Sequence, residues 1–193
     1  QTWEKTSAGS YRNTGRKKDS VSPEILFVER CIKWLKPGGR LGIVLPDGIL
    51  GNPGDEYIRW WMMRNCWLIG SVKAPVELFV AEANVGILTS FVFLKKKTEE
   101  EIAAEDLGGV KDYPVFMALA EKVGFDRRGN ALYKRMPDGE EIVEEVEEVE
   151  RIRVGGKNIT RTLRRRKKIV DDDLPFIVKA FKDFRSENVE PGK

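Results

Sequence analysis

The sequence predicts an α/β fold: part of a doubly wound sheet whose last strand runs antiparallel to its neighbours. Three observations predict it. Residues 41–46 form a short unbroken apolar run, a helical pattern at 55–66 leads into a second run at 67–73, and residues 86–94 are β-branched and aromatic. Such runs are typical of strands buried on both faces of a sheet. The 193 residues, 41% of them hydrophobic, predict one main core.

The N-terminal part is expected to be a loop followed by a helix. Residues 1–21 are polar and glycine-containing, without apolar periodicity. Ser22, Pro23 and Glu24 then provide an N-cap, a proline at the first helical position and an acid in the first turn. Apolar side chains at helical spacing, ended by Lys36-Pro-Gly-Gly, predict a helix over 23–35.

The central segments predict two parallel strands and one antiparallel strand. Strand 41–46, helix 55–66 and strand 67–73 form one βαβ unit, whose strands run parallel. The dozen residues before 86–94 show no helical pattern, so no crossover helix is available. Antiparallel pairing is therefore expected for the third strand.

Composition divides the chain into a loop (1–21), a strand core (22–97) and a charged extension (98–193) with a hairpin and a C-terminal helix. The extension opens with an acidic linker or short helix at 98–109 and an apolar segment at 114–120. Pro137-Asp-Gly predicts the hairpin turn.

The rest of the extension is strongly charged. Seven Glu lie between 140 and 150, and nine Arg and Lys between 151 and 168. Residues 142–152 fit one helix face, although their Glu and Val alternation also permits a strand; helix is favoured here. Residues 155–168 are expected to be mobile. Acids at 171–173 predict the start of a helix running to about Phe184.

Several chemistries are excluded or disfavoured. The chain has no His, which excludes imidazole bases, Ser-His-Asp triads and His-containing metal sites. Cys31 and Cys66 lie in apolar helical contexts typical of core thiols, as expected in a reducing compartment. No apolar run approaches the ~20 residues of a membrane span. Four tryptophans are expected to pack in the core: Trp34, Trp60, Trp61 and Trp67.

An ordered series of segments resembles the later half of the catalytic domain in modification subunits of type I restriction–modification systems, which are adenine-N6 DNA methyltransferases. The resemblance covers about 20–185 and implies the last three strands of a class I S-adenosylmethionine-dependent (Rossmann-like) methyltransferase sheet. Its segments are Ser22-Pro-Glu-Ile-Leu-Phe-Val-Glu-Arg-Cys, Leu35 to Leu50, Gly51-Asn-Pro-Gly-Asp-Glu-Tyr-Ile-Arg, Val76-Glu-Leu-Phe, Val85 to Leu94, Lys122 to Tyr133 and Asp171-Asp-Asp-Leu-Pro.

The family's two central motifs are missing from the chain. Neither the glycine-rich cofactor motif nor the catalytic Asn-Pro-Pro-aromatic motif is present, and Asn52-Pro53-Gly54 lacks the second proline and the aromatic. Gly48, Gly51 and Gly54 follow the wrong strand for a cofactor loop. The resemblance therefore implies a fragment that has no catalytic residue, binds neither cofactor nor metal, and is inactive alone.

The resemblance also implies partners. These are S-adenosylmethionine in the full-length parent, duplex DNA, the missing N-terminal half of the same subunit, and specificity and restriction subunits, in a prokaryotic cytoplasm and away from membranes. Two other functions stay open: a DNA- or subunit-binding module without catalysis, and a methyltransferase fragment acting on RNA or a small molecule.

Three groups of residues are candidates for a site. By resemblance, Phe79 stacks on a flipped adenine, or else it anchors its loop. Pro46, Asp47 and Gly48 lie just beyond the carboxyl end of strand 41–46, where open α/β sheets bind ligands, and are candidates for the rim of a ligand cleft. The alternative is that Asp47 only caps or turns the chain there. A basic run contacts DNA phosphates, or else it offsets the Glu-rich segment before it. The run is Arg164, Arg165, Arg166, Lys167 and Lys168.

Overall fold

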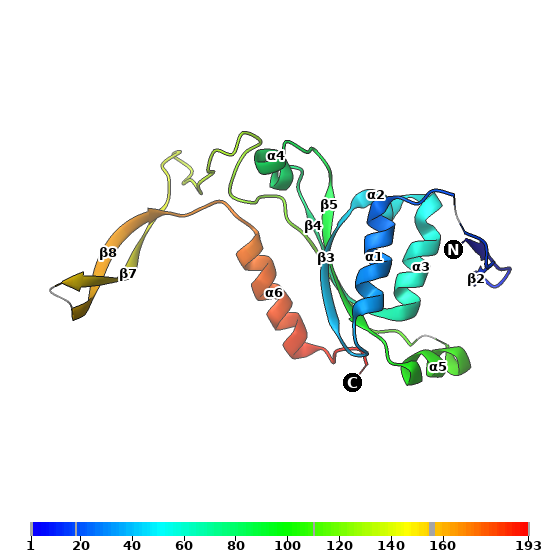
Figure 1. The fold of residues 1–193 in the computed structure, drawn as a ribbon. Coiled ribbons are helices and arrows are strands. Elements are labelled where there is room, and N and C mark those ends of the chain that lie inside the picture. Colours follow the sequence, from blue (N-terminus) through cyan, green and yellow to red (C-terminus); the bar gives the residue numbers. More distant parts are fainter. Residues whose placement is uncertain (1, 18, 110, 155–156, 193) are drawn as a thin grey trace.

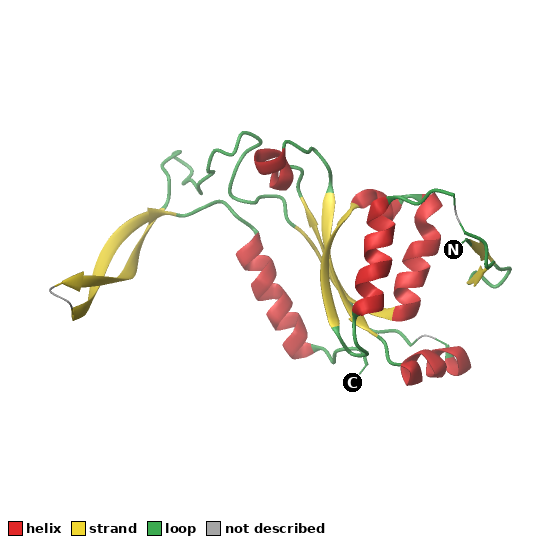
Figure 2. Cartoon of the chain, in the orientation of Figure 1, coloured by secondary structure: helices red, strands yellow, loops and turns green. Residues whose placement is uncertain are grey.

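The computed structural model describes residues 2–17, 19–109, 111–154 and 157–192, and its body consists of three layers (Figure 1). A mixed sheet forms the middle layer, with two helices on one face and one on the other (Figure 2). The strands, in sheet order, are β3 (Arg40–Pro46), β5 (Thr89–Lys96), β4 (Cys66–Ala74) and β6 (Phe116–Leu119). The covering helices are α1 (Pro23–Trp34) and α3 (Glu56–Asn65), opposite α6 (Leu174–Glu187).

The strand directions agree with the prediction. β5 lies between β3 and β4 and is antiparallel to both, so β3 and β4 run parallel to each other. Thr89 pairs with Pro46 on one side and with Ala74 on the other. The carboxyl ends of the two parallel strands therefore meet at one edge of the sheet. β6 adds a further parallel strand beside β4.

Each face of the sheet has its own apolar contacts. The face toward α1 and α3 holds the tightest packing, because alternate residues of β3 and β5 point into it. On the opposite face, the Phe116 ring lies 5.2 Å from Phe181 and 5.5 Å from Phe184, which attaches α6 to the sheet. The most buried members of the first cluster are Val28, Ile32, Leu45, Met62, Cys66, Val92 and Leu94.

β3 forms one edge of the sheet, with β5 as its single neighbour among the described residues. The amide of Asp47 donates to the Leu88 carbonyl at 3.0 Å, which fixes the hydrogen-bonding alternation along the pair. By that alternation the backbone N–H groups of Gly42 and Val44 face away from β5. Unpaired N–H and C=O groups on an edge strand are a template for another strand.

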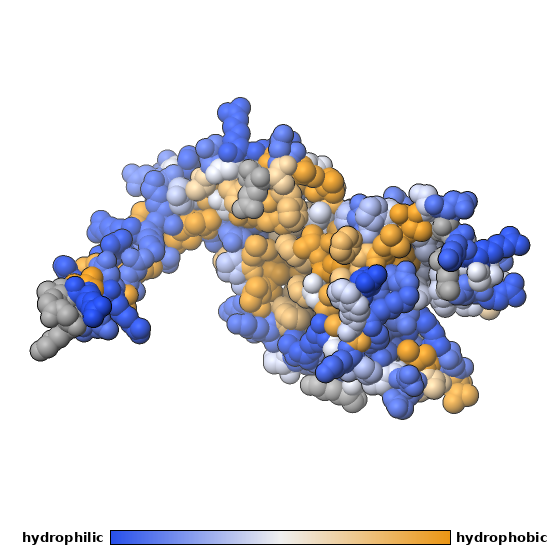
Figure 3. Space-filling model, in the orientation of Figure 1, coloured by the Kyte–Doolittle hydropathy of each residue, from blue (hydrophilic) through white to orange (hydrophobic). Residues whose placement is uncertain are grey.

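The surface beside this open edge is apolar. Phe27 of α1 is 67% exposed on one side of the sheet, and Val44 of β3 is 41% exposed on the other. Figure 3 shows hydrophobic side chains gathered between α6 and α1, where β3 runs in Figure 1. The open edge and its hydrophobic flanks together form a surface suited to a further α/β layer.

The N-terminal residues differ from the expected loop. They form a short hairpin of β1 (Trp3–Lys5) and β2 (Tyr11–Asn13). The Trp60 ring of α3 lies 5.7 Å from the Trp3 ring and 5.6 Å from the Tyr11 ring, and this aromatic cluster holds the hairpin against the body. Strands of three residues are too short to show an alternating pattern, so they could not be predicted from the sequence.

The tryptophans pack less uniformly than expected. Trp67 is buried and Trp60 and Trp61 are half-buried, but Trp34 is 75% exposed and lies against the Arg30 guanidinium at 5.2 Å. The expectation that Trp34 packs in the core is therefore wrong. Trp34 lies on the face of α1 opposite the buried residues Ile25, Val28 and Ile32, so it points away from the sheet.

The expected helix at 142–152 is wrong as well. This segment is β7 (Val143–Val154), which pairs antiparallel with β8 (Lys157–Lys168) to form a long arm that projects from the body (Figure 1). Alternating Glu and Val fits the helical and the strand period alike. The basic strand that follows decides for β, because four of the five Glu of β7 stand opposite a cation of β8. Residues 155–156, within the segment expected to be mobile, lie outside the described residues.

Shorter helices complete the body: α2 (Asp47–Gly51), the 3₁₀ turn η1 (Pro53–Asp55), α4 (Glu77–Ala83) and α5 (Glu99–Gly108). α4 was missed because its seven residues show no clear stripe. The described residues contain no helix with the length and apolar character that crossing a membrane requires.

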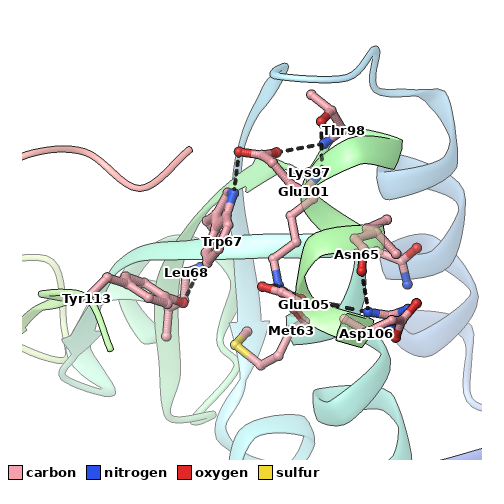
Figure 4. A network of polar contacts seen from close by, with 12 residues as sticks. Met63, Asn65, Trp67, Leu68, Lys97, Thr98, Glu101, Glu105, Asp106 and Tyr113 are labelled. Carbon is pink, nitrogen blue, oxygen red and sulfur yellow. Dashed lines mark hydrogen bonds and ion pairs between the residues drawn. The ribbon is translucent and has the colours of Figure 1, made fainter. Parts of the chain in front are cut away.

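α5 is attached through a partly buried polar network (Figure 4). Lys97 Nζ lies 2.6 Å from Glu105 Oε1, and both side chains are almost fully buried, at 2% and 7% exposure. The same Nζ donates to the Met63 carbonyl at 2.7 Å and sits 4.3 Å from the Trp67 ring centre. Trp67 Nε1 donates to Glu101 at 3.1 Å. The network fixes α5 to α3 and the amino end of β4.

Candidate functional site

The candidate site lies where the carboxyl ends of β3 and β4 meet. Asp47 is the first residue after β3, and its carboxylate lies 2.8 Å from Lys73 Nζ, near the end of β4. Ser90, at the start of β5 between them, donates to Asp47 Oδ1 at 3.2 Å. Three neighbouring strands thus contribute one polar side chain each. In open α/β sheets this edge binds ligands.

Sequence reasoning singled out Asp47 but missed Lys73 and Ser90. Lys73 is the one charged residue in the apolar strand Cys66–Ala74, and its position near the strand end was the available signal. Its partner was not visible from sequence, because it comes from another strand 26 residues earlier. The contacts to Lys73 and Ser90 fix the Asp47 side chain, while its backbone starts α2.

The glycines near this edge do not form a cradle for a cofactor. A Cβ at Gly51 or at Gly54 would meet nothing within 4 Å, and one at Gly48 would approach only the Asn52 side chain, at 3.2 Å. A loop that holds a nucleotide needs glycine, because its backbone must approach the ligand closely. These three glycines follow β3, whereas the resemblance places the family's cofactor loop after the first strand of the sheet, so they do not supply that loop.

α4 begins three residues after the carboxyl end of β4 and brings Phe79 to the same edge of the sheet. The Phe79 side chain is half-buried. Asn84 ends the helix in the left-handed conformation, with a φ of 51°. Two exposed apolar side chains, Ile87 and Leu88, then lead into β5. This edge thus presents an aromatic and an apolar segment beside the Asp47–Lys73 pair.

A pocket of about 600 Å³ lies between α4 and the segment 121–132. Arg127 Nε donates to Glu77 at 2.9 Å, and this contact holds the pKa of the Glu77 carboxyl below its usual value. The Ala120 amide donates to the Lys73 carbonyl at 2.9 Å, which places the pocket at the carboxyl end of β4 and β6. Its lining combines Val123, Phe125 and Leu132 with Lys122, Asp126, Arg127 and Arg128.

The predicted basic run lies in β8, at the base of the arm, away from this edge (Figure 1). Each of its five cations has a glutamate partner within 4 Å. The pairs are Arg164–Glu147 at 3.2 Å, Arg165–Glu148 at 3.5 Å, Arg166–Glu145 at 3.6 Å, Lys168–Glu141 at 2.6 Å, and Lys167 with Glu148. The Glu-rich strand therefore neutralises the run.

A model of the N-6 DNA methylase family matches residues 1–150 of the chain. The match includes β3, β4 and β5, the Asp47–Lys73 pair, α4 and the segment that lines the pocket. It also includes most of β7, whereas β8 and α6 lie beyond the matched residues.

Curated relatives match shorter parts of the chain. The methylase subunit of the type I restriction enzyme EcoKI from Escherichia coli is 32% identical over 96 residues, as is that of StySJI from Salmonella typhimurium. In each case the match covers 47% of this chain and 17% of the relative. The ubiquinone biosynthesis O-methyltransferase of a Chelativorans species is 33% identical over 69 residues, covering 33% of this chain and 27% of that protein.

A solved structure also matches. It is a class I S-adenosylmethionine-dependent methyltransferase from Listeria monocytogenes, with a TM-score of 0.37 and 26% sequence identity. The alignment covers 49% of this chain and 26% of that one.

Proposed function

The chain belongs to the N-6 DNA methylase family, and on that premise we propose that it forms the closing part of a catalytic domain that methylates adenine N6 in duplex DNA. S-adenosylmethionine supplies the methyl group in this reaction. The glycine-rich loop and the Asn-Pro-Pro-aromatic motif come from a segment outside these 193 residues. The chain itself contributes the last strands of the sheet and one wall of the substrate site.

The open edge of β3 carries the proposal. Gly42 and Val44 direct unpaired backbone groups outward, between apolar surfaces of α1 and of β3. A parallel strand added here, with a helix against Phe27, would continue the sheet and bury that side chain. The carboxyl end of that strand would then lie beside Asp47. A catalytic motif following it would face the edge that holds α4.

Phe79 is the proposed base-stacking residue. It lies on α4, at the same edge as the end of β3, and an adenine extruded from the duplex needs an aromatic face against which to stack. Pro46, Asp47 and Gly48 form the rim between that base and the added strand. In this role the contacts of Asp47 to Lys73 and Ser90 keep the rim rigid.

The likeness to type I methylase subunits extends the proposal to partners. The parent protein would act with a specificity subunit that selects the DNA sequence and with a restriction subunit, in the bacterial cytoplasm. Contact of Arg164–Lys168 with DNA phosphates stays a prediction, and would require these cations to leave their glutamates.

The test is methyl transfer by the chain joined to the segment that precedes Gln1 in its reading frame. Tritiated S-adenosylmethionine, duplex DNA and the joined protein should give N6-methyladenine on nucleoside analysis, whereas the chain alone should give none. Phe79→Ala should lower the rate at least tenfold, and Phe79→Tyr should restore most of it. Methylation of cytosine, or of RNA in preference to DNA, would contradict the proposed substrate.

A second candidate function is favoured by the arm. A module that only binds DNA or a subunit would keep the arm and the open edge but need no methyl donor. The same assay separates the two, because a binding module joined to its preceding segment would retain DNA without methylating it.

A further inference from the structure

The arm formed by β7 and β8 divides into two halves of different charge. Each strand has 12 residues, so the arm reaches roughly 40 Å at about 3.3 Å per residue. In the half near the body, five cations of β8 are paired with glutamates. In the outer half, Glu150 is the one acidic residue among the cations Arg151, Arg153 and Arg161. The outer half is therefore basic.

The pairing register shows which side chains share a face. Paired residues of an antiparallel ladder point to the same side, and successive residues alternate. The pairs Val149–Thr162, Arg151–Thr160 and Arg153–Asn158 follow one another on one face of the outer half. Glu150 pairs with Arg161 on the opposite face. We call the first set of residues other than Val149 the tip face: Arg151, Arg153, Asn158, Thr160 and Thr162.

The tip face has no carboxylate and makes no ion pair among the described residues. Arg151 and Arg153 are exposed, as are the three polar side chains opposite them. The next acidic residue on this face is Glu147, which is taken by Arg164 at 3.2 Å. Two guanidinium groups two residues apart, beside hydroxyl and amide groups, are thus presented to solvent at the far end of a narrow ribbon.

We propose that the tip face binds the phosphate backbone of duplex DNA. Arginine, threonine and asparagine are the side chains that commonly contact phosphate oxygens, and a two-stranded ribbon is narrow enough to lie along or in a major groove. Glutamates neutralise the cations of the inner half, so the tip face is expected to contribute more to DNA binding than Arg164–Lys168 do. The inference rests on the proposed DNA substrate.

A long two-stranded ribbon is only marginally stable by itself. Ion pairs support the inner half of this arm, whereas the outer half has none among the described residues. DNA bound at the tip face would supply such contacts to the outer half. The arm would then hold the duplex at a distance from the edge of the sheet where methylation is proposed. A contact with the phosphate backbone does not depend on the DNA sequence, and it weakens as the salt concentration rises.

The test measures binding of a fluorescein-labelled duplex DNA to the full chain by anisotropy, over a range of salt concentrations. Arg151→Gln with Arg153→Gln should weaken binding about tenfold at moderate salt. The slope of log affinity against log salt should fall by about 2, one unit for each arginine. Arg151→Lys with Arg153→Lys keeps the charge and should retain most of the slope.

The matched control is Arg164→Gln with Arg166→Gln, which removes the same charge from the same face of the inner half. It should change affinity by less than the tip variant does. Unchanged affinity in the tip variant, equal loss in both variants, or no binding by the wild-type chain would overturn the inference. The tip variant is also tested for binding to labelled polyglutamate. Loss of polyglutamate binding with unchanged DNA binding would overturn the inference, because it would assign the tip face to an acidic protein.

The two proposals fail separately. If the joined protein does not methylate DNA but the tip variant still loses DNA binding, only the catalytic proposal fails. If the joined protein methylates DNA equally well with and without the tip arginines, and binding is also unchanged, only the tip face fails.

Discussion

Asp47 and Lys73 form an ion pair of 2.8 Å that joins the ends of two parallel strands across the antiparallel strand between them. The pair ties α2, which starts at Asp47, to the strand that leads into α4. Because Ser90 donates to the same carboxylate, all three strands are locked at one edge. The relative position of the rim and Phe79 depends on this lock.

The coupling between Asp47 and Lys73 should be measurable but small. Their side chains are 30% and 46% exposed, so solvent screens the pair. A double-mutant cycle with Asp47→Ala and Lys73→Ala in urea should give a coupling of about 0.5 to 1 kcal/mol. The exposed pair Glu4–Arg12, at 3.9 Å, is the control and should give none. A larger coupling in the control pair would contradict this assignment.

Breaking the buried pair below α5 should cost far more. Lys97→Met removes the nearest cation from the buried Glu105 and leaves Arg64, at 3.7 Å, as its partner, which should lower the free energy of unfolding by about 3 kcal/mol. Adding Glu105→Leu should recover much of that loss. Lys33→Met, which removes the exposed partner of Glu29, should change stability by less than about 0.5 kcal/mol. Equal effects of the two lysine variants would show that burial does not govern the Lys97–Glu105 pair.

Cys66 should make stability fall at high pH. Burial raises the pKa of its thiol from 9.0 to about 11, so the folded protein binds a proton that the unfolded chain releases earlier. The stabilising contribution is complete below pH 9 and is lost as pH rises towards 11. Urea midpoints at pH 8 and pH 10 should show the fall, and Cys66→Ala should reduce it. An identical fall in both proteins would assign it to other groups.

The arm should lose its order in acid before the body does. Hydrogen bonds from Lys168 and Lys167 hold the pKa values of Glu141 and Glu148 below the usual 4.5. Their contribution to the arm is therefore complete above about pH 4.5 and is lost as pH falls through the lowered values. Amide NMR shifts of β7 and β8 should move to coil positions at a higher pH than those of β4. Loss of order in the arm and in β4 at the same pH would contradict this prediction.

The strand core could be predicted because each strand is signalled locally. β3, β4 and β5 are short apolar runs bounded by Gly, Pro or charge. The antiparallel direction of β5 was predicted from the lack of a helical pattern before 86–94, and the short helix α4 that lies there does not cross the sheet. The ordered match to one family fixed which strands they are. α1 and α6 followed from caps and periodicity, even though α4 was missed for lack of a stripe.

The arm and the site geometry could not be predicted in the same way. Glu and Val alternation at 142–152 fits helix and strand alike, and the decision lies in pairing with residues up to 25 positions later. Likewise, Asp47 could be placed at a strand end, but Lys73 becomes its partner only once β5 separates β3 from β4. Non-local pairing therefore decides what local patterns leave open.

The most direct measurement of the central claim is amide hydrogen exchange along β3. In the chain alone, the outward N–H groups of Gly42 and Val44 should exchange quickly, while that of Ile43, directed at β5, is protected. Joined to the segment that precedes Gln1, Gly42 and Val44 should become as protected as Ile43. Unchanged exchange at both residues in a joined protein that methylates DNA would contradict the claim that β3 is completed by a further strand.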